Sequence, residues 1–184
     1  PPRGPMPAER DLLANGAFTD LLKDTWQVYN DQGGDGPSIN GSVTVTDDQG
    51  HHGVRFLRQG SSGNHNETGI IQQVGKDVSD AEIIRLRADL LVASQSLSGG
   101  GYLSSEYPVM IKIRYRDIKG GENIWVRGFY YQNDTHSPTN DGEQVKQGLW
   151  YPYESPNLAD ALNPKPSQIL SVAIYASGWD FDSM

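Results

Sequence analysis

Basic and aromatic side chains recur at every second position in two neighbouring segments, residues 109–116 and 124–131, and this pattern could bind a sugar. Sugar-binding sites pair an aromatic ring, which stacks on the apolar face of a pyranose, with planar polar groups that hydrogen-bond its hydroxyls. Both kinds of side chain are present in these two segments, and the earlier segment 83–93 adds polar side chains such as Arg87. The candidate ligand-binding residues are Trp125, Arg127, Tyr131, Arg87 and Arg114.

The same alternation also has a purely structural explanation. Trp125 and Phe129 lie on one side of a strand and can pack in a core, while the arginines pair with carboxylates on a solvated face. A second aromatic group, Trp150-Tyr151-Pro152-Tyr153, is either another stacking platform or a cap over one end of a sandwich. Both alternatives remain open at the level of the sequence.

Catalytic and metal-binding patterns are weaker than the binding pattern. Aspartate and glutamate are plentiful, but no spacing marks a pair of carboxylates for glycoside hydrolysis. His51, His52 and His65 fall in polar loops without the spacing of a metal site. The glycine run 99–101 lacks the Gly-Lys-Ser/Thr sequence that holds a phosphate. We therefore expect a binding protein and not an enzyme.

Composition and charge exclude several classes of partner. The 184 residues carry 15 Lys and Arg against 23 Asp and Glu, a net charge of -8, which is the opposite of what a nucleic-acid backbone attracts. No apolar run approaches the roughly 18 residues of a membrane span, so we expect no membrane insertion. Cysteine is absent, which excludes disulfides and thiolate metal sites.

The segments that must position the candidate residues have the character of short β-strands. The chain contains 21 Gly and 11 Pro without a period, which suits strands joined by many turns. Alternating or β-branched runs predict strands at residues 26–29, 42–46, 52–58, 69–74, 83–93, 109–116, 124–131 and 169–176. A long Gly/Ser-rich loop, 94–108, precedes the strand at 109–116, and loops of this length are often functional.

The clearest pair of strands is 109–116 and 124–131, which the turn Lys119-Gly120-Gly121 joins into an antiparallel hairpin. Strict alternation places Lys112, Arg114 and Arg116 on the side that faces away from the core. If that side coincides with the sides that carry Trp125 and Arg87, the three strands form one Arg-rich, aromatic-lined sheet face. This face is our expected binding surface.

Three motifs resemble a known family. They are the opening Leu12-Leu13-Ala14-Asn15-Gly16-Ala17-Phe18 with Trp26 soon after, the central Gly69-Ile70-Ile71-Gln72-Gln73-Val74, and the final strand leading into Gly178-Trp179-Asp180. In this order they resemble the carbohydrate-binding modules among galactose-binding-like jelly rolls. The resemblance implies an all-β, jelly-roll β-sandwich of the galactose-binding-like kind.

The resemblance also implies a function and a domain organisation. We expect a non-catalytic binding module of a secreted or surface protein, extracellular or at the cell surface, whose partner is a glycan. The alternative is a structural or protein-interaction domain of a bacterial surface protein, with another surface protein as its partner. Residues 1–10 are expected to be a Pro-rich linker, and residues 11–184 a single β-sandwich domain truncated before its last strand.

Many modules of this family hold a structural calcium ion, and two departures here bear on that site. An acidic residue usually follows the opening Phe, but Thr19 stands there and Asp20 comes one position later. A last strand with a further acidic ligand is also expected to be missing. No cofactor is therefore expected beyond a possible weak structural calcium, with oxygen ligands from Asp20, Asp180 or Asp182.

Overall fold

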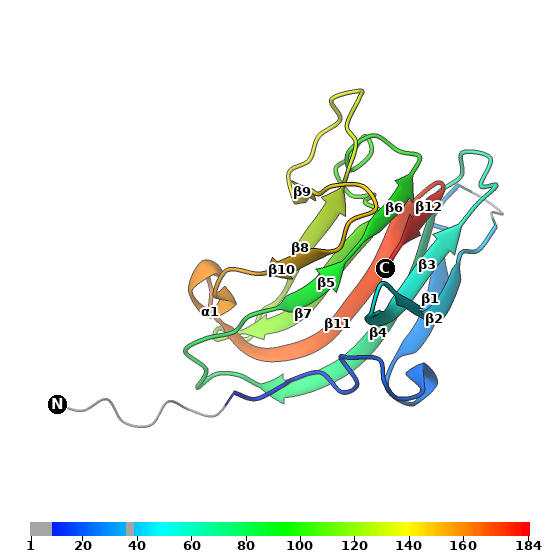
Figure 1. Cartoon of the computed structure of the whole chain (residues 1–184). Coiled ribbons are helices and arrows are strands. Elements are labelled where there is room, and N and C mark those ends of the chain that lie inside the picture. The colour runs from blue at the N-terminus through cyan, green and yellow to red at the C-terminus, as the bar shows by residue number, and fades with distance from the viewer. Residues whose placement is uncertain (1–8, 36–38) are drawn as a thin grey trace.

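A computed structural model describes residues 9–35 and 39–184, and it shows two layers of β-sheet packed face to face. Figure 1 shows the layers, with β5 and β10 lying in front of β7 and β8. The all-β sandwich predicted from the alternating segments is therefore confirmed. Most of the expected linker, residues 1–8, lies outside the described residues.

The strands divide between the layers as follows. The first layer is a six-stranded sheet with the order β1 (Gln27–Asp31), β4 (Asn66–Asp77), β11 (Pro166–Gly178), β7 (Val109–Asp117), β8 (Glu122–Tyr130) and β9 (Gly142–Gln144). The second layer contains β2 (Ser42–Asp48), β3 (His51–Arg58), β12 (Phe181–Ser183) and β6 (Val92–Gln95), followed by the pair β5 (Arg87–Leu90) and β10 (Tyr151–Glu154).

The connections between strands are those of a jelly roll. The chain crosses repeatedly from one layer to the other, and strands distant in sequence become neighbours. β11 lies between β4 and β7 in the first layer, while β12 lies between β3 and β6 in the second. The last 19 residues, 166–184, therefore supply an internal strand to both sheets. The strand β12 was not predicted from the sequence.

Burial follows the period of the strands. Along β7, Ile111, Ile113 and Tyr115 are at most 5% exposed and pack against the second layer, whereas Lys112, Arg114 and Arg116 point the other way. The predicted orientation of these three basic residues is confirmed. We call the side of the six-stranded sheet that carries them the outer face.

One predicted strand is interrupted. Residues 83–93 were expected to form a continuous strand, but the structure has β5 and β6 with a break at Leu91 and no strand at residues 83–86. There the backbone N–H groups of Ile84 and Leu86 donate to the side chains of Asn157 (2.9 Å) and Ser155 (2.9 Å). These side-chain acceptors replace a neighbouring strand.

Among the described residues, helical structure is limited to two short segments. They are the 3-10 turn η1 (Leu22–Asp24) and the single α-helical turn α1 (Leu158–Ala161), whose first turn is capped by the side chain of Asn157. No helix in the described part of the chain has the length and apolar character needed to cross a bilayer.

Candidate functional site

The outer face contains a shallow depression of about 250 Å³, which we call the outer groove. Small side chains on the central strand β11 form its floor, and longer side chains on both flanking strands form its walls. Ala173 pairs with Ile71 on one side and Lys112 on the other. The lining residues are Tyr29, Glu67, Ile71, Lys112, Arg114, Ser171 and Ala173.

The Tyr29 ring forms the wall on the β1 side, and a glycine allows it to lie close to the buried Tyr175. Gly69 on β4 pairs with Tyr29 on one side and with Tyr175 on the other. A Cβ atom at Gly69 would lie 2.4 Å from Tyr175 Cβ and 3.0 Å from Tyr29 Cε1. Glycine is therefore required for the two tyrosines to meet across the strand.

A chain of polar contacts runs from Tyr29 across the groove. The Tyr29 hydroxyl donates to Glu67 Oε1 (2.5 Å), and burial together with this carboxylate raises the pKa of Tyr29. The same Glu67 oxygen lies 3.9 Å from Lys112 Nζ, which sits 4.7 Å from the centre of the Tyr175 ring. The groove thus offers an aromatic surface beside a carboxylate and an ammonium group.

Arginines occupy the other end of the groove. Arg114 Nη2 donates to Glu122 Oε2 (2.8 Å), and Arg116 Nη2 donates to Glu122 Oε1 (3.0 Å). These two hydrogen bonds lower the pKa of Glu122. Arg114 is about half exposed at 48%, so its guanidinium is accessible to a ligand.

The long Gly/Ser-rich loop covers one part of the outer face, at β8 and β9. The fully buried ring of Tyr107 lies over Gly128 on β8 and Gly142 on β9, where an added Cβ would come within 2.2 Å and 2.5 Å of it. The Tyr107 hydroxyl shares a hydrogen bond with Ser104 Oγ (2.7 Å). The loop thus covers the sheet at Gly128 and Gly142, while Ile124 on β8, which pairs with Arg114, remains 58% exposed beside the outer groove.

The structure does not bring the predicted binding residues onto one face. Ile113 pairs with Trp125 and Ile111 with Arg127, and residues directly opposed in an antiparallel pair share a side. Trp125 and Arg127 therefore point toward the second layer, away from the side that carries Arg114. The register of the hairpin corrects the expectation of one Arg-rich, aromatic-lined face.

Trp125, Arg127 and Tyr131 lie instead where the two layers meet. Trp125 and Tyr131 pack against the main core cluster, which contains the fully buried Phe129. Arg127 Nη2 donates to Glu143 Oε2 (3.1 Å), and Glu143 also accepts a hydrogen bond from Tyr151. Phe129 therefore lies in the core and Trp125 packs against it, as the structural explanation of the alternation predicts.

Arg87 belongs to the other layer. It lies on β5, and its Nε donates to Glu154 Oε2 (2.7 Å) across the β5–β10 pair. Arg85 Nη1 binds the other oxygen of the same carboxylate (2.6 Å). Of the five residues predicted to bind ligand, Arg114 alone lines the outer groove.

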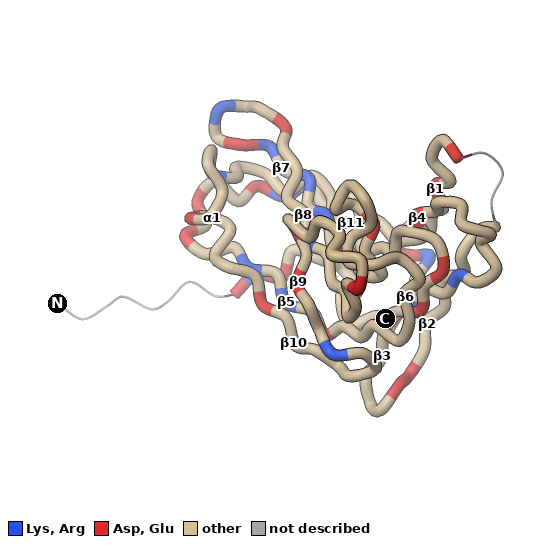
Figure 2. The backbone as a smooth tube through the Cα atoms, turned by 90° about the horizontal axis from the view of Figure 1, so that it is seen from above, with Lys and Arg blue, Asp and Glu red and all other residues tan. Residues whose placement is uncertain are grey.

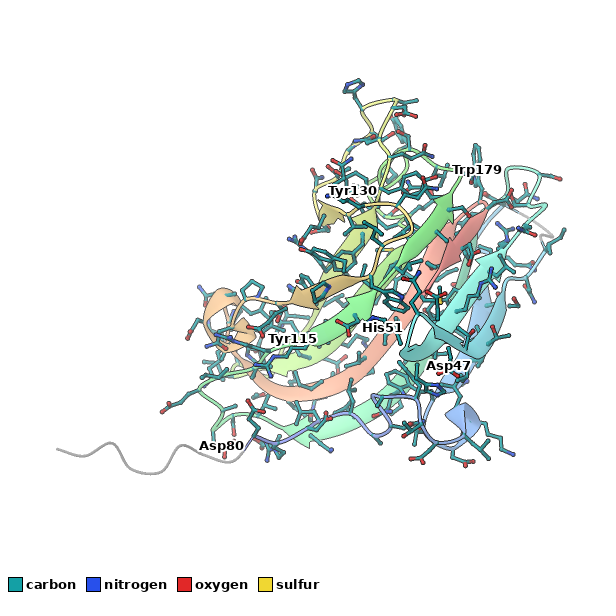
Figure 3. All side chains as sticks on the ribbon, in the orientation of Figure 1. Asp47, His51, Asp80, Tyr115, Tyr130 and Trp179 are labelled. Atoms are coloured by element: carbon teal, nitrogen blue, oxygen red, sulfur yellow. The ribbon has the colours of Figure 1, made fainter. Side chains whose placement is uncertain are left out.

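The aromatic group at residues 150–153 is neither a single platform nor a single cap. Tyr153 is buried and packs edge-on against Phe129, with ring centres 4.9 Å apart. Trp150 stacks on His51 at 4.2 Å, and its Nε1 donates to Asp48 Oδ2 (3.0 Å). Figure 3 shows His51 where the β2–β3 hairpin turns into β3.

The acidic residues considered for calcium have other roles in the structure. Asp182 accepts two hydrogen bonds from Arg55 (2.6 and 2.7 Å), and Asp180 Oδ1 accepts one from the Ser61 N–H (3.0 Å). Asp20 is exposed. Within residues 9–35 and 39–184, no group of three or more His, Asp or Glu side chains is placed to hold a metal ion.

Most residues of the outer groove were not predicted from the sequence. Tyr29, Glu67, Ser171 and Ala173 come from segments far apart in the chain, and none stands out alone. A local signal was available at Gly69, the first residue of the predicted strand 69–74, because a glycine in a strand often marks a close approach of neighbouring groups.

Comparison with known proteins adds little to this geometry. No protein-family model and no curated protein matches the chain. One similar solved structure is the enzymatically active domain of tailspike protein 4 of bacteriophage CBA120, with 9% identity, a TM-score of 0.44 and coverage of 94% of this chain and 20% of that chain. Another contains the CBM22-1 and GH10 modules of a Clostridium thermocellum xylanase complexed with xylohexaose. It has 12% identity and a TM-score of 0.41, and the match covers 87% of this chain and 24% of that chain.

A third similar structure is a carbohydrate-binding module, CBM28, specific for non-crystalline cellulose, with 14% identity and a TM-score of 0.47. It covers 95% of this chain and 90% of the module. This chain spans about a fifth and about a quarter of the first two structures. Two of the three contain carbohydrate-binding modules, the class that the sequence resembles, but similarities this low do not say what this chain binds.

Proposed function

We propose that this domain is a non-catalytic binding module of a secreted or cell-surface protein, and that it binds a glycan in the outer groove. The observation that carries the proposal is the composition of the groove. Apolar side chains of Ala173 on the floor and Ile71 on the wall lie near the Tyr29 ring, and polar groups of Glu67, Lys112 and Arg114 surround them. This combination suits the apolar face and the hydroxyls of a sugar ring.

The length of the groove suits a chain of sugars better than a single ring. Arg114 is level with Ser171 and Gln73, six residues along β4 from Glu67. The rise of an antiparallel strand makes this roughly 20 Å along the backbone. Ligand contacts distributed over this length would come from four strands, β1, β4, β11 and β7.

The carboxylates of the groove support a non-catalytic role. Glycoside hydrolysis uses two carboxyl groups that flank the scissile bond. Glu67 is the one carboxylate among the lining residues, and it is engaged by Tyr29 and Lys112. We expect the protein to bind glycans without releasing new reducing ends, which a reducing-sugar assay measures.

The test is a glycan array followed by calorimetric titration of the best ligand. We expect Tyr29→Ala to weaken binding roughly three- to tenfold, because an aromatic contact is lost. Ser171→Trp places an indole in the groove and should abolish binding. Arg87→Ala, an exposed change on the other layer, is the matched control and should leave the affinity unchanged.

Circular dichroism and thermal melts establish that each variant is folded. Selective binding that is lost in both groove variants and kept in the control would support the proposal. A folded wild-type domain that binds no glycan would contradict it.

A second candidate function, protein interaction, is favoured by one exposed apolar pair. Tyr102 and Leu103 at the tip of the Gly/Ser-rich loop are 87% and 75% exposed. Tyrosine is enriched where proteins meet, and neighbouring exposed apolar side chains can mark an interaction site. If no glycan binds, sedimentation of the wild type and of the double variant Tyr102→Ser, Leu103→Ser would show whether this loop mediates self-association.

A further inference from the structure

The outer face carries a column of basic side chains on an otherwise acidic protein. Lys112, Arg114 and Arg116 follow one another at every second position of β7, while the whole chain has a net charge of -8. Figure 2 shows acidic positions distributed along the chain and basic positions on β7. The column is therefore a local departure from the overall charge.

Carboxylates of the same chain neutralise the positive charges of this column only in part. Among the described residues, the carboxylate within ion-pair distance of Arg114 and Arg116 is Glu122 in both cases, so two positive charges share one negative charge. Lys112 is near Glu67, which also accepts the hydrogen bond from Tyr29. An excess of positive charge consequently remains at the arginine end.

The two ends of the groove differ in sign. Asp31 pairs with Glu67 across β1 and β4, so both carboxylates lie at the tyrosine end. At the opposite end, Arg114 is level with Ser171 on the floor, and Arg116 lies beyond it, paired with Gln168. An anionic group on a ligand would be repelled at the tyrosine end of the groove and attracted at the arginine end.

We propose that the outer groove selects glycans that carry a negative group, a uronate carboxylate or a sulfate, and that Arg114 binds this group. The inference rests on the proposed glycan-binding function and specifies its ligand class. A guanidinium suits either anion, because its planar fork can donate two parallel hydrogen bonds. The anion takes the place of Glu122, whose exposed side chain turns away into solvent.

Matched pairs of glycans test the ligand class by calorimetric titration. Oligogalacturonate is compared with its methyl ester, which keeps the backbone but removes the charge. Oligosaccharides of carrageenan are compared with the same oligosaccharides after desulfation, which keeps the backbone but removes the sulfate groups. We expect at least one acidic member to bind about tenfold more tightly than its neutral counterpart, and the pair that shows this identifies the anion.

Two variants with opposite effects test the role of Arg114. Arg114→Gln should remove most of the preference for the acidic glycan. Glu122→Gln removes the competing carboxylate and should strengthen binding of the acidic glycan by roughly two- to fivefold while leaving the neutral glycan unchanged. Lys119→Gln, which removes an exposed charge in the turn after β7, is the control and should change neither affinity.

The outcomes separate this inference from the proposed function. Equal affinity for the acidic and neutral members, with binding still lost in Ser171→Trp, would overturn the anion preference and leave glycan binding intact. A preference that survives Arg114→Gln would overturn the assignment to Arg114. Absence of binding to every glycan by the folded protein would overturn both proposals.

Discussion

Glycines inside the strands of the first layer shape its outer face. Gly69 lets Tyr29 and Tyr175 meet across β4, and Gly128 and Gly142 leave room for the ring of Tyr107. In each case the missing side chain allows an aromatic ring to lie on the sheet itself. The tyrosine wall of the outer groove therefore depends on a residue that has no side chain.

Replacement of Gly69 by alanine tests this dependence. The new Cβ would lie 2.4 Å from Tyr175 Cβ and 2.8 Å from the Ile174 carbonyl oxygen, a backbone atom that cannot move freely. We expect Gly69→Ala to lower the free energy of unfolding by about 1–3 kcal/mol, as overpacking does. Urea denaturation monitored by tryptophan fluorescence measures it.

Gly34→Ala is the control for this prediction. Gly34 is exposed, and no atom lies within 4 Å of the position that a Cβ atom would take there. Its replacement should change the free energy of unfolding by less than about 0.5 kcal/mol. Equal effects at the two glycines would contradict the packing argument.

At the scale of elements, the turn between β7 and β8 sets the register of the hairpin that carries Arg114. Asp117 ends β7 and accepts hydrogen bonds from the Lys119 N–H (2.7 Å), the Gly121 N–H (3.1 Å) and Asn123 Nδ2 (2.7 Å). Burial alone would raise the pKa of Asp117, but these hydrogen bonds outweigh it and lower the pKa. The turn is thus stabilised by an ionised aspartate.

The lowered pKa of Asp117 predicts that the stability of the fold depends on pH. The stabilisation by Asp117 is present above the unfolded pKa of about 3.9 and is lost as the pH falls through the lower, folded value. We expect the wild type to melt at a higher temperature than Asp117→Asn at neutral pH, and the difference to shrink below about pH 4. Thermal melts of both proteins between neutral and acidic pH measure it, and a difference independent of pH would contradict it.

At the scale of the whole molecule, the last residues of the chain hold the two layers together. β11 is central in the first layer, and β12 lies inside the second. Phe181 is 1% exposed in a core cluster with Trp26, Phe56 and Ile70. Between the two strands, the carbonyl groups of Gly178 and Trp179 accept hydrogen bonds from the buried Arg58.

Removal of the Phe181 ring should therefore destabilise the whole domain. We expect Phe181→Ala to lower the free energy of unfolding by about 3–5 kcal/mol, the usual cost of removing a buried phenylalanine. Trp179→Ala is the control two residues away, since that side chain is 40% exposed at the end of β11 (Figure 3). It should cost less than about 1 kcal/mol. Chemical denaturation measures both values. If the two variants lost similar amounts of free energy of unfolding, the core would not depend on β12.

Local alternation along the chain was sufficient to predict the class of fold and part of the site. The two-residue period of β7 placed Lys112, Arg114 and Arg116 on the outer face, because successive side chains of a strand point to opposite sides whatever its neighbours are. The same local rule identified the β7–β8 hairpin and the strand at residues 169–176. It could not identify β12, whose three residues are too few to show a period.

The tertiary structure alone decided which sides of which strands meet. Trp125 faces the second layer because it pairs with Ile113, and Arg87 is separated from Arg114 because β5 belongs to the other sheet. The outer groove combines Tyr29, Ile71, Lys112 and Ala173, which pairing between distant strands brings side by side. Strand order arises from long-range pairing and from burial of one face of each sheet, and no local pattern encodes it, whereas the register of the β7–β8 hairpin depends on the geometry that its turn adopts in the folded chain.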